Sequence, residues 1–543
     1  MTRLTRIILL VLSAVLLIAA FPNWNQPWCA SIALVPWLLA LRGVKRRGAF
    51  WWSWLVGALF FLGSIWWLVH VTVLGWLVLC AYLGSFFGIF GWIVWRISPK
   101  ELEVGSWKLE RKLPQVKRQE NIQLLASNFQ LLFVVPGVWV VLEYARSHLL
   151  SGLAWNLLGT SQASILPIAQ LAHVTGVWGV SFLEVAINGV IAAALSDRSL
   201  RRVRPAVIVL AMATIGASVY GSRRLASAEP GRPIRVAIVQ GNIPQEEKWD
   251  EEHQPAILAK YAALTRQAVA RSPDLIVWPE TSVPGFFGLE EPITAPVLRL
   301  AADVKIPLLV GAPMGRLRGT MWELTNSAAL IDQQGEIAMR YDKLHLVPFG
   351  EFIPGESVAP WLRNVLPPIG NFIPGHEPVV FRLHADDPAS PAFSVLVCFE
   401  DVFPELARMF VRRGAQLLIT ITNDAWFGDT AAAYQHAQAS TMRAIELGVP
   451  MVRAANTGWS GCIDARGRWL TSVHRDDGHE LFIDGVAACS VTPGAGGGLY
   501  ARWGDWWVAV SAALAAIGLA PALLAAARRP PSLDDAPPSG SVR

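Results

Sequence analysis

The stretch "SVLVCFEDVFPE", residues 394–405, places the end of an apolar strand directly before a polar turn. A run of apolar, β-prone residues stops at Cys398, and two acids, Glu400 and Asp401, follow almost at once. A cysteine that only fills a core does not need a polar turn directly after it. A reactive thiol does need one, because the strand fixes its position and the turn exposes it. The pattern therefore indicates a nucleophilic cysteine, although a cysteine taken alone is more often a core residue.

Apolar strands alternate with amphipathic helices over residues 221–503. The expected helices cover residues 254–272 and 434–448. The expected strands cover residues 234–240, 274–280, 306–313, 326–332, 393–400 and 415–424. Such alternation is typical of a layered α/β domain whose sheets are buried on both faces.

The rest of the chain has the composition of a membrane protein. Hydrophobic residues make up 53% of the 543 residues, charged residues make up 16%, and there are 25 Trp, a residue that anchors membrane interfaces. Apolar segments occur near residues 6–21, 29–41, 50–69, 73–95, 128–145, 166–195, 205–220 and 506–527. We therefore expect a polytopic α-helical membrane domain of about eight spans.

These segments divide the chain into four parts. We expect a membrane domain with about seven transmembrane helices over residues 1–220 and the α/β domain over residues 221–503. A final transmembrane helix is expected over residues 504–527, followed by a disordered cytoplasmic tail over residues 528–543, which is rich in Pro and Ser. No small-x-small cleavage site follows the first apolar segment, so we expect an uncleaved helix there.

Lysine and arginine gather in alternate loops and so predict the orientation. Basic residues precede the first segment, follow the second, fourth and sixth segments, and follow the last, whereas loops such as "PNWNQPW" have none. By the positive-inside rule the basic loops are cytoplasmic, and the α/β domain then lies outside the cytoplasm.

Several classes of site have no support in the sequence. There is no Gly-rich phosphate loop and no CxxC pair, and the net charge of +5 is too modest to indicate a nucleic-acid partner. We expect no cofactor and no metal. The five cysteines show no disulfide framework, and because their number is odd at least one thiol stays free of internal pairing.

Three residue types at strand ends form a plausible catalytic set. Glu280 ends "DLIVWPE", Lys343 lies in "RYDKLHLVPFGEFIP", and Cys398 ends "FSVLVC". Strand ends in α/β domains hold reactive side chains at a crevice. An acid, an amine and a thiol there would serve as base, charge stabiliser and nucleophile. Taken singly, Glu280 is equally a helix cap and Lys343 a solvated loop lysine.

The local sequences around these residues resemble one known family. The segments "PQEEKWD", "VWPETSVP", "YDKLHLVPFGEFIP", "VCFEDVFPE", "TNDAWFG" and "RAANTGWSG" are similar to those of the apolipoprotein N-acyltransferases, members of the nitrilase superfamily. The resemblance covers most of the chain. It implies an extracytoplasmic, nitrilase-like αββα sandwich, and multi-pass insertion in the bacterial inner membrane with this domain on the periplasmic side.

The resemblance also implies an activity and the residues that carry it. A fatty acyl chain would pass from a membrane phospholipid, through a thioester, to the α-amine of an N-terminal diacylglyceryl-cysteine of an apolipoprotein. By matching motifs, Glu280 is the general base, Lys343 the triad lysine and Cys398 the nucleophile. The supporting acids would be Glu351 and Glu400.

Two further positions follow from the same motifs. Trp249 matches a substrate-binding tryptophan. The family commonly has Tyr directly after the cysteine, and this chain has Phe399, so the phenolic hydroxyl is missing. The backbone N–H of Phe399 remains and would serve the oxyanion. The expected partners are the phospholipid donor, the diacylglyceryl apolipoprotein and membrane lipid, with the enzyme a monomer.

Two alternatives remain open at this stage. A membrane-tethered amidase or nitrilase-type hydrolase would use the same triad, with water as the second acceptor. A multi-span transporter would carry functional acids within its spans, and Glu143 and Glu184 are the candidates for that role.

Overall fold

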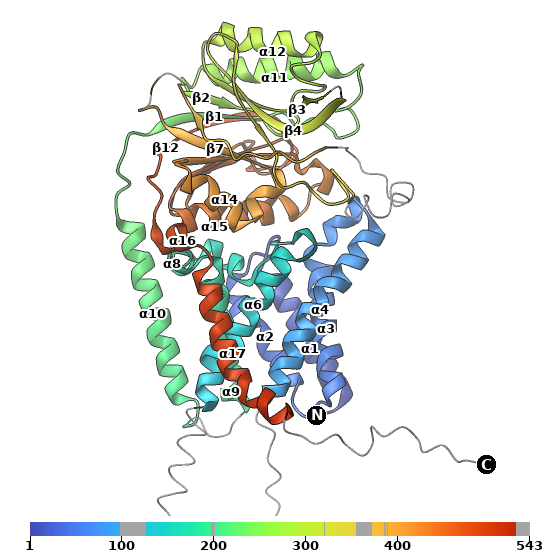
Figure 1. Ribbon diagram of the computed structural model, residues 1–543, viewed down its shortest axis with the longest axis vertical. Coiled ribbons are helices and arrows are strands. Elements are labelled where there is room, and N and C mark those ends of the chain that lie inside the picture. The colour runs from blue at the N-terminus through green and yellow to red at the C-terminus, as the bar shows by residue number, and fades with distance from the viewer. Residues whose placement is uncertain are drawn as a thin grey trace, which may run out of the picture.

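The computed structural model describes residues 1–97, 126–196, 201–319, 321–353, 372–384, 387 and 389–527. A helical part and an α/β part lie one above the other along the longest axis (Figure 1). The tail over residues 528–543 and most of the basic loop over residues 96–120 lie outside the described residues, so the predictions for them stay predictions.

The helical part contains a helix in each of the eight apolar segments. These helices are α1 (Arg3–Ala19), α2 (Ala30–Ala40), α3 (Arg46–Ser64), α4 (Val73–Ile97), α6 (Val135–His148), α9 (Val177–Ser196), α10 (Arg204–Ala226) and α17 (Trp506–Ala527). Among the described residues, four helical stretches are long and apolar enough to cross a membrane: Val73–Ile97, Ala126–Ser151, Val177–Ser196 and Arg204–Ala226. The expectation of about eight spans therefore stays a prediction.

The single helix expected over residues 166–195 is wrong in its first part. Two short helices, α7 (Leu166–Ala169) and α8 (Ala172–Thr175), precede α9. Gly176, with φ of +69°, separates α8 from α9. This left-handed conformation favours glycine and interrupts a helix, and it turns the chain so that α7 and α8 do not continue α9.

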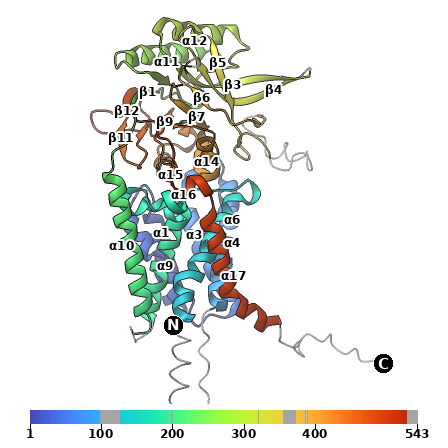
Figure 2. The same cartoon turned by 60° about the vertical axis from the view of Figure 1, so that its left-hand side comes forward.

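The described basic loops and the α/β domain lie at opposite ends of the helical part (Figures 1 and 2). At one end, the Arg6 side chain donates to the Ala40 carbonyl at 3.0 Å, and Arg42 donates to the Ser196 carbonyl at 3.1 Å. At the other end, Gln435 of the α/β domain donates to the carbonyls of Pro22 and Ser64 at 3.0 and 2.8 Å. The described basic loops therefore lie at the end of the helical part that is opposite to the α/β domain.

The α/β part is a sandwich of two six-stranded sheets. One sheet has the order β12-β1-β2-β3-β4-β5 and the other the order β11-β10-β9-β8-β7-β6. The strands of the first sheet are β1 (Ile234–Gln240), β2 (Leu275–Val277), β3 (Leu308–Arg318), β4 (Met321–Ile331), β5 (Ile337–Asp342) and β12 (Gly485–Val491). Those of the second are β6 (Phe381–Arg382), β7 (Ala392–Val397), β8 (Leu417–Thr422), β9 (Met451–Ala455), β10 (Gly461–Ile463) and β11 (Trp469–Ser472).

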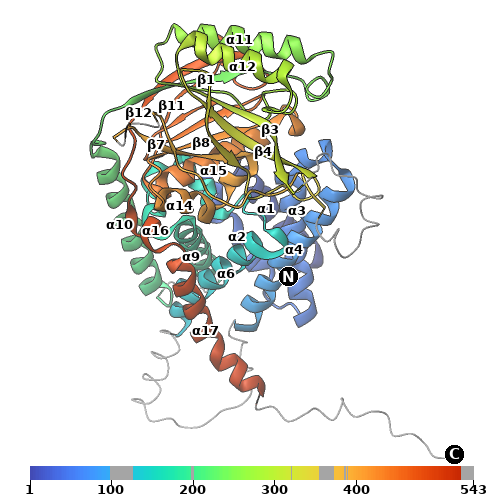
Figure 3. The same ribbon diagram turned by 45° about the horizontal axis from the view of Figure 1, so that its top comes forward.

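Helices cover the outer face of each sheet, which gives the αββα layering (Figure 3). The first sheet is covered by α11 (Gln254–Val269) and α12 (Glu291–Val304), and the second by α14 (Pro404–Arg412) and α15 (Ala432–Leu447). Along β1, Val236 and Ile238 pack into one core and Ala237 and Val239 into another. Because side chains alternate along a strand, these two sets face opposite sides of the sheet, as the continuous apolar strand predicted.

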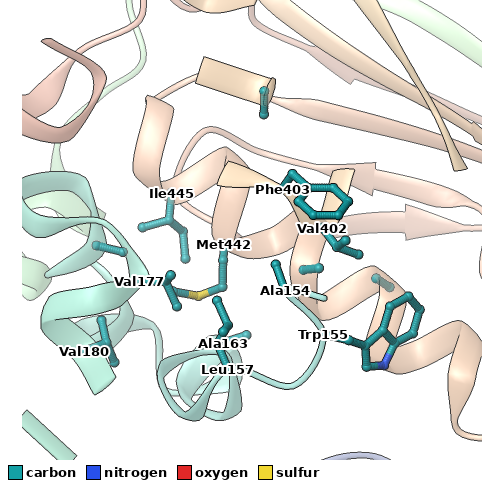
Figure 4. Packing of buried hydrophobic residues seen from close by; sticks show 14 of the residues in the cluster. Ala154, Trp155, Leu157, Ala163, Val177, Val180, Val402, Phe403, Met442 and Ile445 are labelled. Carbon is teal, nitrogen blue, oxygen red and sulfur yellow. The ribbon is translucent and has the colours of Figure 1, made fainter. Parts of the chain in front are cut away.

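The helix layer of α14 and α15 packs on the loops of the helical part. Figure 4 shows Ala154, Trp155 and Ala163 from the helical part beside Phe403 and Met442 from the α/β part. These residues belong to one buried hydrophobic cluster that continues through both parts. The α/β part therefore shares its core with the helical part.

A disulfide joins Cys462 of β10 to Cys489 of β12. It links the two sheets, because these strands belong to different sheets. No such bridge was expected from the sequence, where 27 residues separate the two cysteines without any repeated spacing. The other three cysteines, Cys29, Cys80 and Cys398, are free, which agrees with the expectation of at least one free thiol.

Candidate active site

The three candidate triad residues meet at the ends of their strands. Glu280 follows β2, Lys343 follows β5, and Cys398 follows β7. The Lys343 Nζ lies 3.7 Å from the Glu280 Oε1, and these side chains are 1% and 8% exposed. Cys398 lies close enough for the charges of Glu280 and Lys343 to act on the pKa of its thiol. The structure thus brings together the acid, the amine and the thiol.

Glu280 is held by hydrogen bonds on both carboxylate oxygens. Its Oε1 accepts from the Asn326 side chain at 2.7 Å, and its Oε2 accepts from the Asn423 backbone N–H at 2.9 Å. Asn326 also donates to Glu351 at 2.8 Å. One amide therefore fixes the spacing of two carboxylates, which otherwise repel each other.

Lys343 is a buried cation between two acids. Its Nζ lies 2.9 Å from the Glu351 Oε2, and Glu351 also accepts from the Val347 N–H at 2.7 Å. Burial alone would lower the pKa of Lys343, but the negative charges of Glu351 and Glu280 outweigh it and raise that pKa. Lys343 stays charged, so it can offer hydrogen bonds and positive charge but not take up a proton.

Cys398 stands on a strained turn. Its φ of +55° is in the left-handed region, which residues other than glycine rarely adopt. Burial, and next the charge of Glu280, raise the pKa of the Cys398 thiol well above its usual value, while Lys343 opposes them. The thiol is therefore the resting form, and Glu280 is the adjacent base able to take its proton.

The short 3₁₀ helix Cys398–Val402 begins at the nucleophile, so the N–H of Phe399 lies in the first helical turn. Backbone N–H groups there have no partner within the helix and can donate to an anion. The geometry is consistent with the oxyanion role expected for Phe399. The ring of Phe399 stacks on the ring of Trp155, at a centroid distance of 6.4 Å.

Glu400 joins the turn of Cys398 to the turn of Lys343. It is fully buried and accepts from the N–H groups of Val397, Leu344 and His345 at 2.7, 2.7 and 3.0 Å. The Tyr341 hydroxyl donates to it at 2.8 Å. Burial raises the pKa of Glu400 to about 7. These bonds give Glu400 a positioning role between the nucleophile and the lysine.

Trp249, the candidate substrate-binding residue, lies at the surface. Its side chain is 47% exposed. Its neighbour Lys248 points inward instead, is 1% exposed and donates to the Glu280 carbonyl at 3.1 Å. Burial lowers the pKa of Lys248 to about 7. This second buried lysine could not be predicted from the sequence, because "PQEEKWD" contains four charged residues and nothing distinguishes the one that turns inward.

A second residue that the sequence did not single out is His436 of α15. Its Nε2 lies 2.8 Å from Asp401 and 3.2 Å from the Cys398 carbonyl, and its Nδ1 lies 3.0 Å from Asp424. Burial alone would lower the pKa of His436, but the charge of Asp401 raises it to about 9. A charged imidazole ring therefore lies against the backbone carbonyl of Cys398.

The ring of His436 contacts the helical part through Trp155, at a centroid distance of 5.2 Å. The Trp155 indole N–H donates to Gln435 at 2.8 Å. Trp155 therefore packs against His436, which contacts the Cys398 carbonyl, and against Phe399, the residue after Cys398. Among the described residues, no group of three or more His, Cys, Asp or Glu side chains is placed to hold a metal ion.

Comparison with known proteins assigns both parts of the chain. Residues 235–483 match the family model of the carbon-nitrogen hydrolases, and residues 13–190 match that of the N-terminal domain of apolipoprotein N-acyltransferase. An apolipoprotein N-acyltransferase of Geobacter metallireducens is 36% identical over 94% of both chains. The chain belongs to the apolipoprotein N-acyltransferase family.

A second relative agrees with this family. A second apolipoprotein N-acyltransferase, from Chlorobaculum tepidum, is 30% identical over 84% of this chain and 86% of its own. Among solved structures, a Nesterenkonia amidase of the nitrilase superfamily is 20% identical, with a TM-score of 0.37 over 51% of this chain and 96% of the amidase. The relatives confirm the family expected from the sequence, and the two packed sheets with their outer helices confirm the expected αββα fold.

Proposed function

We propose that the chain transfers a fatty acyl chain from a membrane phospholipid to the α-amine of a diacylglyceryl-cysteine at the N-terminus of an apolipoprotein. The observation that carries the proposal is the buried cluster of Glu280, Lys343 and Cys398 in a member of this family. A thiol beside one acid and one permanent cation suits transfer through a thioester.

In the first step Glu280 takes the proton of the Cys398 thiol, and the sulfur attacks the carbonyl carbon of the phospholipid ester. Lys343 and the Phe399 N–H stabilise the oxyanion of the tetrahedral intermediate. The intermediate then releases the lysophospholipid, whose leaving oxygen takes the proton back from Glu280. Cys398 is left as a thioester.

In the second step the neutral α-amine of the acceptor attacks the thioester carbonyl. Glu280 takes a proton from the attacking nitrogen, Lys343 again faces the oxyanion, and the departing sulfur recovers the proton from Glu280. The products are an amide and the free thiol. The acid thus moves a proton twice in each step, whereas the lysine moves none.

The proposed location is the bacterial inner membrane, with the α/β part on the periplasmic side and the helical part crossing the membrane several times. Three observations support it. The described basic loops lie at the end away from the α/β part. The disulfide Cys462–Cys489 suits an oxidising compartment. Four of the described helical stretches are long and apolar enough to cross a membrane.

The remaining predictions belong to the same proposal. The domain limits are residues 1–220, 221–503, 504–527 and 528–543, and the enzyme acts as a monomer. An alkaline phosphatase fused after Arg223 tests the orientation, and we expect the fused phosphatase to be active. If a reporter that works only in the cytoplasm is active when fused at the same position, the periplasmic placement is refuted.

The activity is tested with purified chain in detergent, phospholipid and a diacylglyceryl lipopeptide. We expect the lipopeptide to gain one acyl chain at its α-amine, with Cys398→Ala inactive. A product consisting of free fatty acid alone, with the lipopeptide unchanged, would favour the hydrolase instead. A chain with Glu143→Ala and Glu184→Ala that still acylates the lipopeptide would count against the transporter.

A further inference from the structure

Lys248, in the loop over residues 244–250, is a buried amine that the proposed mechanism does not use. It is 1% exposed, and its Nζ donates to the Glu280 backbone carbonyl at 3.1 Å, the one hydrogen bond that the described residues give it. Lysine is almost never fully buried without a partner. Burial lowers the pKa of Lys248, and the charges of Glu280 and Cys398 oppose this, so the amine lies close to both. A primary amine keeps N–H donors in either protonation state, so the bond to the carbonyl does not depend on the charge of Lys248.

The backbone that Lys248 holds is tightly constrained. Thr281, which follows Glu280, has a φ of +46°, in the left-handed region that residues other than glycine rarely adopt. Gly311 of β3 packs against the same turn, where a Cβ atom would clash with the Pro279 carbonyl oxygen and lie 2.6 Å from the Glu280 Cα. Strained conformations persist only where their surroundings hold them. The hydrogen bond from Lys248 is one of the contacts that hold this turn.

A second contact from the same loop leads to the carboxylate of Glu280. Gln245 accepts from the Asn423 side chain at 2.7 Å, and the Asn423 backbone N–H donates to the Glu280 Oε2 at 2.9 Å. The chain just before the loop is also fixed, because the Asn456 side chain exchanges two hydrogen bonds with the backbone of Ile243, at 2.9 and 2.7 Å. The loop therefore holds the backbone of Glu280 directly and its carboxylate through Asn423.

Lys248 is the one buried residue of this loop, which the structure describes in full. Its neighbours in the chain, Glu247 and Trp249, are exposed. Trp249 is the candidate for contact with substrate. A substrate contact at Trp249 would therefore act on a loop whose buried side chain ends at Glu280.

We propose that Lys248 is a positioning residue for Glu280. Its Nζ fixes the backbone that carries the carboxylate beside the Cys398 thiol, while Gln245 of the same loop fixes the residue that donates to that carboxylate. The loop therefore sets the place of the base without moving a proton itself. The inference rests on the base role of Glu280 in the function proposed above.

The test compares wild type with Lys248→Met, which keeps the length of the side chain but removes its N–H donors. Alkylation of Cys398 by iodoacetamide reports ionisation of the thiol by the base, and single-turnover acylation by a chromogenic acyl ester reports the chemical step. We expect both rates to fall by roughly tenfold, with the half-saturating ester concentration unchanged within about twofold. The matched control is Lys260→Met, which removes an amine of α11 that is 35% exposed and 3.6 Å from Asp484, and it should change neither rate.

A double variant separates positioning from a merely structural role. In a chain that already carries Glu280→Gln there is no base to position, so adding Lys248→Met should change the alkylation rate by less than about twofold. A further loss of roughly tenfold in the double variant would show that Lys248 acts independently of Glu280, and it would overturn the proposal. A wild-type alkylation rate in Lys248→Met alone would also overturn it.

Gln245 decides the matter if Lys248→Met does not fold. Gln245→Leu removes the acceptor of the Asn423 side chain and should slow alkylation by roughly threefold or more. Gln333→Leu, at an exposed glutamine between β4 and β5, is its control. An unchanged rate in Gln245→Leu would overturn the role of the loop. Because alkylation needs neither lipid nor lipopeptide, a wild-type chain that never acylates the lipopeptide would refute the proposed function and leave this test intact.

Discussion

Replacing Trp155 by alanine should slow acylation of Cys398, although Trp155 belongs to the helical part. Trp155 is 5% exposed, and its ring packs at a tilt against that of His436 at 5.2 Å and stacks on that of Phe399 at 6.4 Å. Aromatic pairs contribute about 0.5–1.5 kcal/mol each beyond their burial. The variant loses two such pairs beside the turn of Cys398, so the interaction energy that holds this turn in place falls by about 1–3 kcal/mol. This corresponds to a rate reduced by about 5–150-fold.

The assay is single-turnover acylation by a chromogenic acyl ester, with the rate of Cys398 alkylation as a second reading. Cys398 is the free cysteine that is not fully buried, since Cys29 and Cys80 are buried. Trp155→Phe should stay near the wild-type rate, because it keeps a ring in the stack.

Trp24→Ala, at an indole 62% exposed, is the control and should change the rate little. If the Trp155→Ala chain keeps its melting temperature and acylates within twofold of wild type, the positioning role is refuted. If the chain unfolds, the Trp155→Phe result and its alkylation rate still decide between packing and positioning.

Three other predictions follow from the same site. Glu280→Gln and Lys343→Met should each lower single-turnover acylation by about 10²–10³, because the first removes the proton acceptor and the second removes the positive charge that faces the oxyanion. A wild-type rate in either variant would exclude that residue from its proposed role. Asn326→Leu should slow acylation by at least tenfold without loss of lipid binding, because the two carboxylates it bridges then repel; a wild-type rate would contradict this. Because the pKa of His436 is raised to about 9, its charged ring stabilises the fold by roughly 3 kcal/mol below pH 6.5, and this contribution is lost as the pH rises through 9. The melting temperatures of wild type and His436→Gln should therefore converge above pH 9. A constant difference between them would refute the charge on His436.

The sequence predicted the site best where a strand carries each residue to its position. Glu280 and Cys398 lie at the ends of strands that the sequence predicted, so strand pattern places these two residues at one region of the sandwich, whereas the strand before Lys343, Ile337–Asp342, was not predicted. The resemblance added their roles and the acid Glu351, which the structure places 2.9 Å from Lys343. Local pattern and tertiary structure agree at these positions.

The sequence could not predict contacts that depend on packing between distant segments. His436 lies in the middle of a helix, and its contact with the Cys398 carbonyl exists only because α15 packs beneath β7 and β8. Cys462 and Cys489 pair across two sheets, so neither local spacing nor strand pattern marks them. The break at Gly176 is a conformational property of one residue within an apolar run. For the histidine and the disulfide the deciding information is the arrangement of the layers, and for Gly176 it is the local backbone conformation.

The most direct test of the proposed chemistry is the mass of the peptide that contains Cys398. Wild-type chain is incubated with a phospholipid of defined acyl chain, without acceptor, then digested under acidic conditions. The thioester account predicts that this peptide gains one acyl group, that hydroxylamine removes it, and that a diacylglyceryl lipopeptide added before digestion takes it up. An unmodified Cys398 in a chain that still acylates the lipopeptide would contradict the account.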